Sequence, residues 1–473
     1  MPAPTAGLPD LNLDRAGALP LAEQIHLSLR AAILEGRIAA GARLPSWRDL
    51  ATQLGVARGT VRAAYDRLAD EMLVATAGAA GTRVAAPAAT VAAGAAEPAA
   101  IRRPLADMIH GFSKPPLAFQ MGVPAQDGFP AKSWARARLR AVRADALGPT
   151  SYADPRGQPA LREQLAAYLA MARGIACVPD QILVTGGFRG GLALALRALA
   201  LPAGAEVWTE EPGFPLTRRA LTLAGLEAVP VPVDGEGLDV ACGIAKAPGA
   251  ALAIVTPGQQ APLGVALSPA RRRALLDWAA GAGAWVIEDD YLSELQLRGR
   301  PAPALFAGDR HGRVIHIGSF SKTLSPALGL GFTVLPLALA ERFAEAAALL
   351  GPAPDIATQM AVAAFIADGH YLRHLRHMKR LYGERRRALV ARLGLGGDET
   401  MMAGLAVLVR LAPDVDDVRL AAAAVARGLA PAPLSPWYVE QAGVRGLLLG
   451  VTNPAPRDLE RAVRALLGLL AGG

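Results

Sequence analysis

The sequence predicts two domains of different class: a small N-terminal domain of helices with a terminal hairpin, and a large α/β domain with a mainly parallel sheet. At 473 residues the chain exceeds what one ordinary hydrophobic core supports. Residues 85–115 begin with an Ala-, Pro- and Gly-rich run without amphipathic period, which is typical of a linker. Beyond it, short apolar runs alternate with helical segments, as in a parallel sheet covered by helices. We therefore divide the chain into residues 1–84, 85–115 and 116–473.

The small domain has the spacing of three helices followed by a hairpin. Apolar residues recur at helical intervals over 21–34. Ser46 is a suitable N-cap for a second helix that runs to Leu54, and a third helix is expected over about 58–71. The residues after it, 73–86, have the pattern of a short two-stranded ribbon. In order and size these elements make a winged helix-turn-helix.

The third helix begins with Arg58, Thr60 and Arg62, and recognition helices contact DNA with their N-terminal ends. Arg48, on the helix before, is expected to reach a flanking phosphate or base. Five arginines and one acidic residue lie between positions 37 and 62. The net charge of +8 by itself decides nothing, because an Ala-, Gly- and Arg-rich composition also produces it. A solvated bundle with incidental arginines is the alternative to a DNA-binding domain.

The large domain contains six predicted strands and three clear helical segments. The strands are expected at Ile182–Val184, Glu206–Trp208, Ala228–Val233, Leu252–Val255, Trp285–Ile287 and Val314–Ile317. The helices are expected at Pro159–Ala172, Gly191–Ala200 and Pro269–Ala282. Because ligands of such folds bind at the carboxyl ends of the strands, the residues that follow the strands are the candidates for a site.

A lysine with hydroxyl neighbours follows the last of these strands. Lys322 lies in the segment Gly318–Thr323, close to Ser319 and Ser321. A lysine amine in this position can form an imine with an aldehyde, while the hydroxyls hold a nearby phosphate. A surface lysine is the alternative, and the motif alone does not decide between the two.

Three further segments fit the same chemistry. Asp289 and Tyr291 follow a strand and match the carboxylate and phenol that the chemistry of a pyridine aldehyde requires. The glycine-rich turn Gly187–Arg189 opens a helix, where backbone N–H groups bind phosphate. Phe214, in a turn, could stack on the pyridine ring. Taken singly, each feature has an alternative interpretation. The acidic residues also fit a metal or surface cluster, the glycine-rich segment an ordinary turn, and Phe214 a core phenylalanine.

Nearly the whole chain resembles a known family. The run from Pro20 to Val74, with its Leu-Pro-Ser-x-Arg and Arg-x-Thr-Val-Arg motifs, is similar to the N-terminal domain of GntR-family bacterial regulators. The segments EEPGFP, IEDDYLSEL and GSFSKTLSPAL resemble the MocR subfamily of that family. MocR regulators join the winged helix-turn-helix to an aminotransferase domain of fold type I, so this fold is expected for the large domain.

The resemblance implies roles for individual residues. The residues that would contact DNA are Arg48, Arg58, Thr60, Arg62 and Gly81. Lys322 would form the internal aldimine with pyridoxal 5′-phosphate (PLP), Asp289 would pair with the pyridine nitrogen, and Tyr291 with the ring hydroxyl. The other residues of the cofactor site would be Phe214, Ser319, Ser321, Gly187, Phe188 and Arg189. No metal site is expected.

The chain departs from the family pattern in its phosphate site. Seven residues after Lys322, Gly329 stands where the family has a phosphate-binding arginine. Arg189 stands where the family has glutamine. We hypothesise that Arg189 restores the missing cation.

Other departures concern the effector. The family's His-Gln and Gly-Leu-His segments read Gln259–Gln260 and Gly404–Ala406 in this chain. The arginine that clamps a carboxylate in aminotransferases aligns near Leu447–Leu449, with Arg410 and Arg445 as nearby candidates. A site without that clamp is expected to recognise ordinary α-amino acids poorly.

We therefore expect a PLP-dependent regulator that binds promoter DNA and responds to an amine, an amino acid or PLP itself. A homodimer is expected, with Tyr152 reaching the partner's cofactor. A working aminotransferase is the main alternative, and a repressor that has lost PLP is a third. No apolar run is long enough to span a membrane, and two cysteines without metal-ligand spacing fit the reduced cytoplasm.

Overall fold

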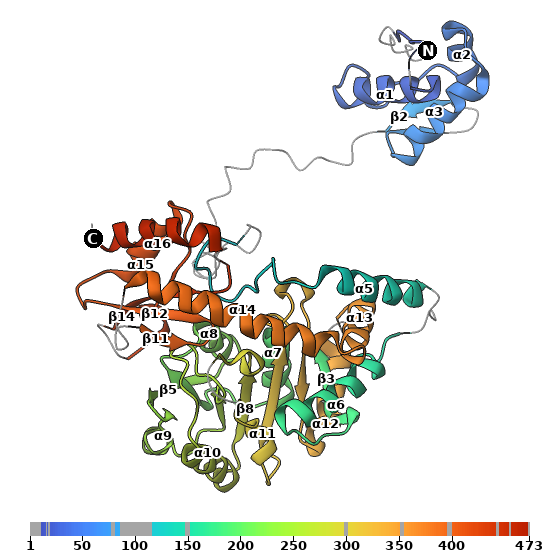
Figure 1. The fold of residues 1–473 in the computed structure, drawn as a ribbon. Helices are drawn as coiled ribbons and strands as arrows, with labels where there is room; N and C mark the ends of the chain where they lie inside the picture. The colour runs from blue at the N-terminus through green and yellow to red at the C-terminus, as the bar shows by residue number, and fades with distance from the viewer. Residues whose placement is uncertain are drawn as a thin grey trace. The chain divides into compact units, whose positions relative to one another are not determined.

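The computed structural model divides the chain into two compact units, Met1–Arg103 and Pro104–Gly473 (Figure 1). The residues that it describes are 11–15, 17, 19–76, 81–85, 116–146, 152–297, 301–350, 354–394, 400–440, 444–453 and 456–471. Positions 86–115 of the predicted linker lie outside the described residues. None of the helices in the described ranges is both long and apolar enough to cross a membrane.

The N-terminal unit is a winged helix-turn-helix. Its elements are α1 (Leu21–Leu34), α2 (Trp47–Leu54), α3 (Arg58–Asp70) and an antiparallel ribbon of β1 (Val74–Thr76) and β2 (Thr82–Val84). Ser46 caps α2 as predicted, because its Oγ accepts a hydrogen bond from the Asp49 N–H at 3.1 Å. Gly55 ends the helix in the left-handed conformation (φ +61°), which makes the turn into α3. Buried residues of all three helices form one apolar core: Ile25, Leu29, Leu50, Val61 and Leu68.

The C-terminal unit is built on an eight-stranded sheet with the order β3-β10-β9-β8-β7-β4-β5-β6. Its strands are β3 (Ile182–Thr185), β4 (Glu206–Glu211), β5 (Glu227–Asp234), β6 (Gly237–Leu238), β7 (Leu252–Val255), β8 (Trp285–Asp290), β9 (Val314–Ser319) and β10 (Gly331–Val334). The five strands from β9 to β5 are parallel, and β10 and β6 are antiparallel to their neighbours. The prediction of a mainly parallel sheet is confirmed.

Helices cover both faces of this sheet (Figure 1). They include α6 (Pro159–Arg173), α7 (Gly187–Leu199), α8 (Pro215–Leu223), α9 (Val240–Lys246), α10 (Pro269–Ala282), α11 (Leu305–Gly308) and α12 (Leu337–Leu350). Alternate residues of a strand face opposite sides. On β8, Ile287 packs in the apolar cluster with α7 and α12, and Val286 packs in the cluster with α9, α10 and α11.

A second, smaller sheet follows along the chain. The helices α5 (Ala131–Ala146), α13 (Ile356–Ala367) and the long α14 (His370–Leu393) lie beside the large sheet. After them come β11 (Thr400–Ala403), β12 (Ala406–Leu411), α15 (Asp417–Val425), β13 (Ala432–Pro433), β14 (Arg445–Gly450) and α16 (Pro456–Leu470). These four strands form an antiparallel sheet with the order β11-β12-β14-β13.

All six predicted strands exist in the structure, with two differences in the surrounding elements. Helix α7 begins at Gly187, four residues before the predicted start, because glycine is a poor helix signal even where it opens a helix. The strand β10 and the whole antiparallel sheet were not predicted. Four-residue β10 is too short and too apolar to show a strand period in the sequence.

We expect Ser46→Ala to lower the free energy of unfolding of the N-terminal unit by about 1 kcal/mol, because α2 loses its only side-chain cap. The substitution Ser46→Asp keeps an acceptor and serves as the control. Urea unfolding followed by circular dichroism measures both. Equal stability of Ser46→Ala and the unchanged protein would contradict the capping role.

Candidate functional site

The carboxyl ends of the parallel strands bring the predicted site residues together. Asp289 is two residues beyond Ile287 on β8, so it faces the same side of the sheet as α7. Ser319, two residues beyond Ile317 at the end of β9, faces that side as well. Lys322 lies in the turn directly after β9. Three residues separated by up to 33 positions in the sequence therefore converge above one edge of the sheet.

Lys322 carries a partly buried amine whose hydrogen-bond partner is a backbone carbonyl. Its Nζ donates to the Gly122 oxygen at 2.9 Å. Gly122 has φ +78°, and a Cβ there would lie 2.5 Å from Nζ, so only glycine leaves room for the amine. Burial lowers the pKa of Lys322 to about 8, with the charge of Asp289 acting in the opposite direction. About one tenth of the amine is therefore neutral, and hence nucleophilic, at pH 7.

Asp289 has a buried carboxylate oxygen that lacks a partner. Its Oδ1 is inaccessible to solvent and makes no hydrogen bond in the described structure. Burial raises the pKa of Asp289 well above its usual value, and the negative charges of Asp290 and Glu210 add to the effect. A buried polar atom without a partner requires an explanation. A donor such as a protonated pyridine nitrogen would satisfy Oδ1, so the residues present fit the pyridoxal cofactor that the resemblance implies.

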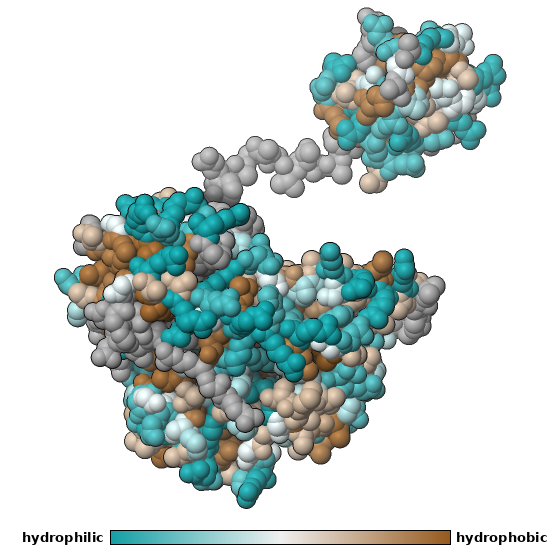
Figure 2. Space-filling view, viewed as in Figure 1, coloured by the Kyte–Doolittle hydropathy of each residue, from teal (hydrophilic) through white to brown (hydrophobic). Residues whose placement is uncertain are grey.

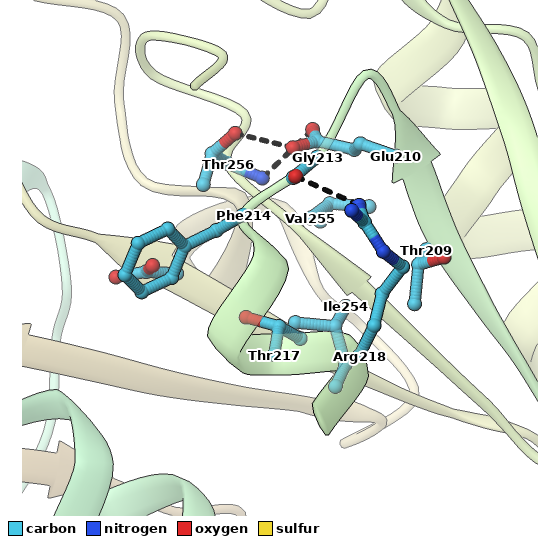
Figure 3. A pocket seen from close by; sticks show the side chains of 10 residues that line it. Thr209, Glu210, Gly213, Phe214, Thr217, Arg218, Ile254, Val255 and Thr256 are labelled. Carbon is cyan, nitrogen blue, oxygen red and sulfur yellow. Dashed lines mark hydrogen bonds between the residues drawn. The ribbon is translucent and has the colours of Figure 1, made fainter. Parts of the chain in front are cut away.

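A narrow pocket leads to Asp289 (Figure 3). It is lined by Thr209, Glu210, Gly213, Phe214, Thr217, Arg218, Ile254, Val255, Thr256 and Asp289. Phe214, at the start of α8, presents its ring beside this pocket and lies 5.7 Å from the ring of Trp437. Arg218 holds the turn, because its Nη1 donates to the carbonyl oxygens of Gly213 at 2.8 Å and Trp437 at 3.0 Å. Phe214 and Asp289 thus line one pocket, and the stacking of Phe214 on a cofactor ring stays a prediction.

Sequence reasoning missed a second carboxylate in the pocket. Glu210 is buried, and its Oε2 accepts a hydrogen bond from Thr256 Oγ1 at 2.6 Å while its Oε1 accepts one from the Thr256 N–H at 2.9 Å. Burial raises the pKa of Glu210 to about 7, against the effect of the Thr256 and Gln260 hydrogen bonds. The available signal was the pair of acids that ends β4 directly before the Pro-Gly-Phe turn.

The glycine turn and the two serines form the predicted phosphate region. Gly187 has φ +73°, and a Cβ there would lie 3.8 Å from both Ser319 Oγ and Ser321 Oγ. Ser319 Oγ donates to Ser321 Oγ at 3.0 Å and accepts from the Ser321 N–H at 3.2 Å. These groups meet at the N-terminus of α7, where unpaired N–H groups favour an anion. Phe188 packs its side chain against the apolar cluster, and Arg189 is exposed.

Tyr291 lies beside two of the segments that depart from the family pattern. A Cβ on Gly404 would lie 3.7 Å from Tyr291 Oη and 3.6 Å from Gln259 Oε1. Gln259 is buried, and its Nε2 donates to the Leu292 carbonyl at 2.9 Å. Burial raises the pKa of Tyr291, so its phenol stays protonated at neutral pH. Gln259, which departs from the family pattern, and Tyr291 thus both lie beside Gly404.

A buried ionic network fixes the end of β8 on the side of the sheet opposite to Asp289. Glu288 and Asp290 face the side of the sheet opposite to Asp289. Arg173 Nε donates to Asp290 Oδ2 at 2.7 Å, with both side chains almost fully buried. His316 Nδ1 lies 3.0 Å from Glu288 Oε2. These contacts restrict the strand end and with it the direction of the Asp289 carboxylate.

The predicted effector arginines remain unassigned. Leu447, Leu448 and Leu449 are fully buried on β14 and belong to the apolar core. Arg410 is exposed, and Arg445 pairs with Leu411 in the register of β12 and β14. Neither position is distinguished by the described contacts. No group of three or more His, Cys, Asp or Glu residues suited to a metal ion occurs in the described ranges.

The predicted DNA-binding residues lie on α2, α3 and the wing. Arg48, Arg58 and Arg62 are exposed and Thr60 is half-buried at the start of α3. Gly81 precedes β2 with φ +84°, and a Cβ there would lie 2.8 Å from Arg43 Nε. Arg43, which the sequence did not single out for DNA contact, therefore lies at the wing.

Both halves of the chain match family models. Residues 21–84 match the bacterial regulatory proteins of the gntR family, and residues 116–445 match aminotransferase class I and II. The probable rhizopine catabolism regulatory protein MocR of Rhizobium meliloti is 35% identical over 470 residues, covering 96% of this chain and 95% of that protein. The pyridoxine biosynthesis transcriptional regulator PdxR of Corynebacterium glutamicum is 35% identical over 373 residues, covering 78% of each.

Solved aminotransferases share the fold of the large unit. An archaeal alanine:glyoxylate aminotransferase superposes with a TM-score of 0.70 at 25% identity, covering 78% of this chain and 94% of that chain. The α-aminoadipate aminotransferase LysN of Thermus thermophilus gives a TM-score of 0.68 at 26% identity, covering 79% and 95%. The second structure was solved with N-(5′-phosphopyridoxyl)-L-leucine.

A winged helix-turn-helix joined to an aminotransferase fold defines a DNA-binding transcription regulator whose second domain has the architecture of an enzyme. The chain belongs to the GntR family of bacterial regulators and, within it, to the MocR group that carries an aminotransferase class I and II domain. Its relatives are named as regulators and not as enzymes, so the regulator is favoured over the aminotransferase alternative.

We expect Asp289→Asn to stabilise the cofactor-free protein at pH 8 by about 1–3 kcal/mol, because it removes the cost of burying a negative charge at this position. The pKa of Asp289 is higher in the folded state than its usual value of 3.8. The folded state therefore loses stability as the pH rises from 3.8 towards the folded-state pKa. At pH 4 the difference from the unchanged protein should therefore shrink.

Asp277→Asn on α10 is the matched control, because Asp277 is exposed. Denaturant unfolding of the cofactor-free proteins at both pH values measures the effect. A variant Asp289→Asn that is no more stable than the Asp277→Asn control at pH 8 would contradict the strained state of this carboxylate.

Proposed function

We propose that this regulator binds PLP at Lys322 and uses it to sense a small amine, which changes the binding of promoter DNA. The observation that carries the proposal is the pairing of a partner-free buried Asp289 oxygen with a lysine amine of lowered pKa in one site. The first group lacks a hydrogen-bond donor and the second is a nucleophile. A pyridine aldehyde has a protonated ring nitrogen that can donate to Asp289 and an aldehyde that can react with the Lys322 amine.

Different residues of the site would bind different parts of PLP. PLP supplies an aldehyde that combines reversibly with primary amines and a ring that withdraws electrons. Lys322 provides the amine of the protein, and Asp289 keeps the ring nitrogen protonated. Phe214 covers one face of the ring, and Tyr291 hydrogen-bonds to its hydroxyl. The phosphate is held by Ser319, Ser321 and the backbone of Gly187, Phe188 and Arg189.

Two similar proteins support PLP as the ligand. LysN was solved with a phosphopyridoxyl amino acid in a domain of the same fold. PdxR, at 35% identity, is named for the regulation of pyridoxine biosynthesis. For the effector of this chain, Gln259, which stands where the family has histidine and lies beside Gly404 as Tyr291 does, favours an amine other than an ordinary α-amino acid.

We further propose a cytoplasmic homodimer. Two winged domains in one assembly would recognise paired half-sites, as other dimeric helix-turn-helix proteins do. Tyr152 supports the dimer, because its side chain is fully exposed although it is a large aromatic. The cytoplasm follows from the DNA partner of the regulator class.

Lys322→Ala should bind promoter DNA but lose the visible absorbance of bound PLP and the response of DNA binding to amines. Lys132→Ala, at an exposed lysine of α5, is the matched control and should retain both. Uptake of PLP by the unchanged protein should be about tenfold faster at pH 9 than at pH 7, since the neutral fraction of an amine with a pKa of about 8 rises by that factor.

Stopped-flow absorbance and gel-shift titration with a panel of amines measure these effects. A Lys322→Ala protein that takes up PLP as tightly as the Lys132→Ala control would refute the assignment of the lysine. Amines that change the spectrum but never the DNA affinity would refute the regulatory part of the proposal.

Arg189→Gln should weaken PLP binding about tenfold, since a charge-assisted hydrogen bond to phosphate is worth more than a neutral one. Arg197→Gln, on the same helix α7, is the control. Spectral titration gives both dissociation constants. Undiminished affinity in Arg189→Gln would show that this arginine does not replace the cation absent at Gly329.

A further inference from the structure

The long helix α14 carries a concentration of positive charge that neither the cofactor site nor the winged helix uses. Over His370–Leu393 it has eight Lys and Arg residues and one Glu, which gives a net charge of +7. The whole 473-residue chain has a net charge of +8. An arginine-rich composition by itself distributes cations along the chain, so it does not account for this helix.

Four of these cations lie in one exposed stripe, which we call the arginine face: Arg373, Arg376, Arg380 and Arg387. At about 100° per residue their side chains fall within an arc of roughly 60°. With a rise of 1.5 Å per residue, the stripe is about 21 Å long. The opposite side of the helix packs into the core through Leu375, Met378, Tyr382 and Leu389. Figure 2 shows strongly hydrophilic surface over this part of the molecule.

The arginine face has one acid at its border, the exposed Glu384, which lies four residues after Arg380 and three before Arg387 but forms no ion pair with either in the described part of the chain. Arg373 Nη1 lies 3.0 Å from His370 Nδ1, and Arg380 Nη2 lies 3.4 Å from His377 Nδ1. Within the parts of the chain that the structure describes, none of the four arginines forms an ion pair with a carboxylate. Like charges three and four residues apart on a helix destabilise it. An arrangement that violates this local rule without internal compensation is expected where a surface has a function.

Several arginines on other helices have carboxylate partners, whereas Arg136 and Arg143 of α5 are exposed and form no ion pair within the described ranges. On α16, which packs against α14, Arg461 lies 2.9 Å from Asp458 and Arg464 lies 2.7 Å from Glu460. On α5, Arg140 lies 2.5 Å from Asp368. Paired cations of this kind are the usual state of a solvated protein surface. The arginine face therefore differs from the general basicity of the chain mainly in the concentration of four exposed cations on one stripe of one helix.

We propose that the arginine face binds the phosphate backbone of duplex DNA, as a contact separate from the winged helix. DNA is the polyanion that a regulator of this class encounters, and each of its strands has one phosphate per 3.4 Å of helix axis. A stripe of about 21 Å therefore faces about six phosphates of one strand. Arginine binds phosphate in a bidentate manner, and such contacts add affinity and salt dependence but no sequence preference.

The test replaces all four arginines of the face by glutamine in the full chain. Binding to a fluorescein-labelled 60-base-pair duplex of arbitrary sequence is followed by anisotropy between 50 and 200 mM KCl. If all four contact phosphate, the slope of log affinity against log salt falls by about 3.6, since each contact contributes about 0.9. The loss of affinity over this salt range then shrinks by about 150-fold.

The matched control removes four arginines that have carboxylate partners, by Arg140→Gln, Arg457→Gln, Arg461→Gln and Arg464→Gln. It changes the net charge equally and should alter the slope by less than one. A version of the arginine face with four lysines should keep most of the slope. Light scattering reports the mass of each protein.

Equal slopes for the glutamine variant and its control would overturn the proposal. An unchanged slope together with a lower mass would also overturn it, because the face would then be an interface between copies. A lysine version that loses the slope as the glutamine version does would overturn the phosphate contact as well, because it keeps the charge.

Discussion

The direction of one carboxylate at the end of β8 is the constraint on which the site depends. Successive side chains of a strand point to opposite faces, so Asp289 and its neighbours Glu288 and Asp290 are separated by the sheet. The two neighbours are satisfied by Arg173 and His316 behind the sheet. Asp289 is left facing the pocket without a partner for Oδ1. A one-residue slip of β8 would exchange these roles and remove the site.

This separation shows how a buried carboxyl group with an unpartnered oxygen is tolerated in the cofactor-free protein. A carboxylate in the interior without a partner is unfavourable, and the protein tolerates it because the rest of the strand end is fixed by ion pairs and by the backbone N–H groups of α11. A ligand that donates a hydrogen bond to Asp289 Oδ1 then gains binding energy, because this oxygen already faces the pocket without a partner. A regulator that senses a ligand requires such a difference between its free and bound states.

The sequence predicted the parts of the molecule whose signals are local. The Ser46 cap, the helix-turn-helix and the six strands followed from capping chemistry and apolar period, and the class of protein followed from motif resemblance. The short β10 and the antiparallel sheet had no comparable signal, because their pairing depends on contacts with distant strands. For the same reason Glu210 was missed, since its burial beside Asp289 depends on how β4 and β8 lie in the sheet. The cofactor and DNA roles of individual residues remain predictions.

The left-handed Gly122 links the reactive lysine to the beginning of the large unit. Its carbonyl is the acceptor for Lys322 Nζ, and the same segment is attached to the smaller sheet, where Gly450 N donates to Phe119 O at 2.8 Å and Asn453 Nδ2 donates to Gln120 O at 2.9 Å. Any molecule that engages the amine deprives this carbonyl of its donor. A ligand on this amine would therefore remove one hydrogen bond from the backbone at Gly122, in the first described segment after residues 86–115.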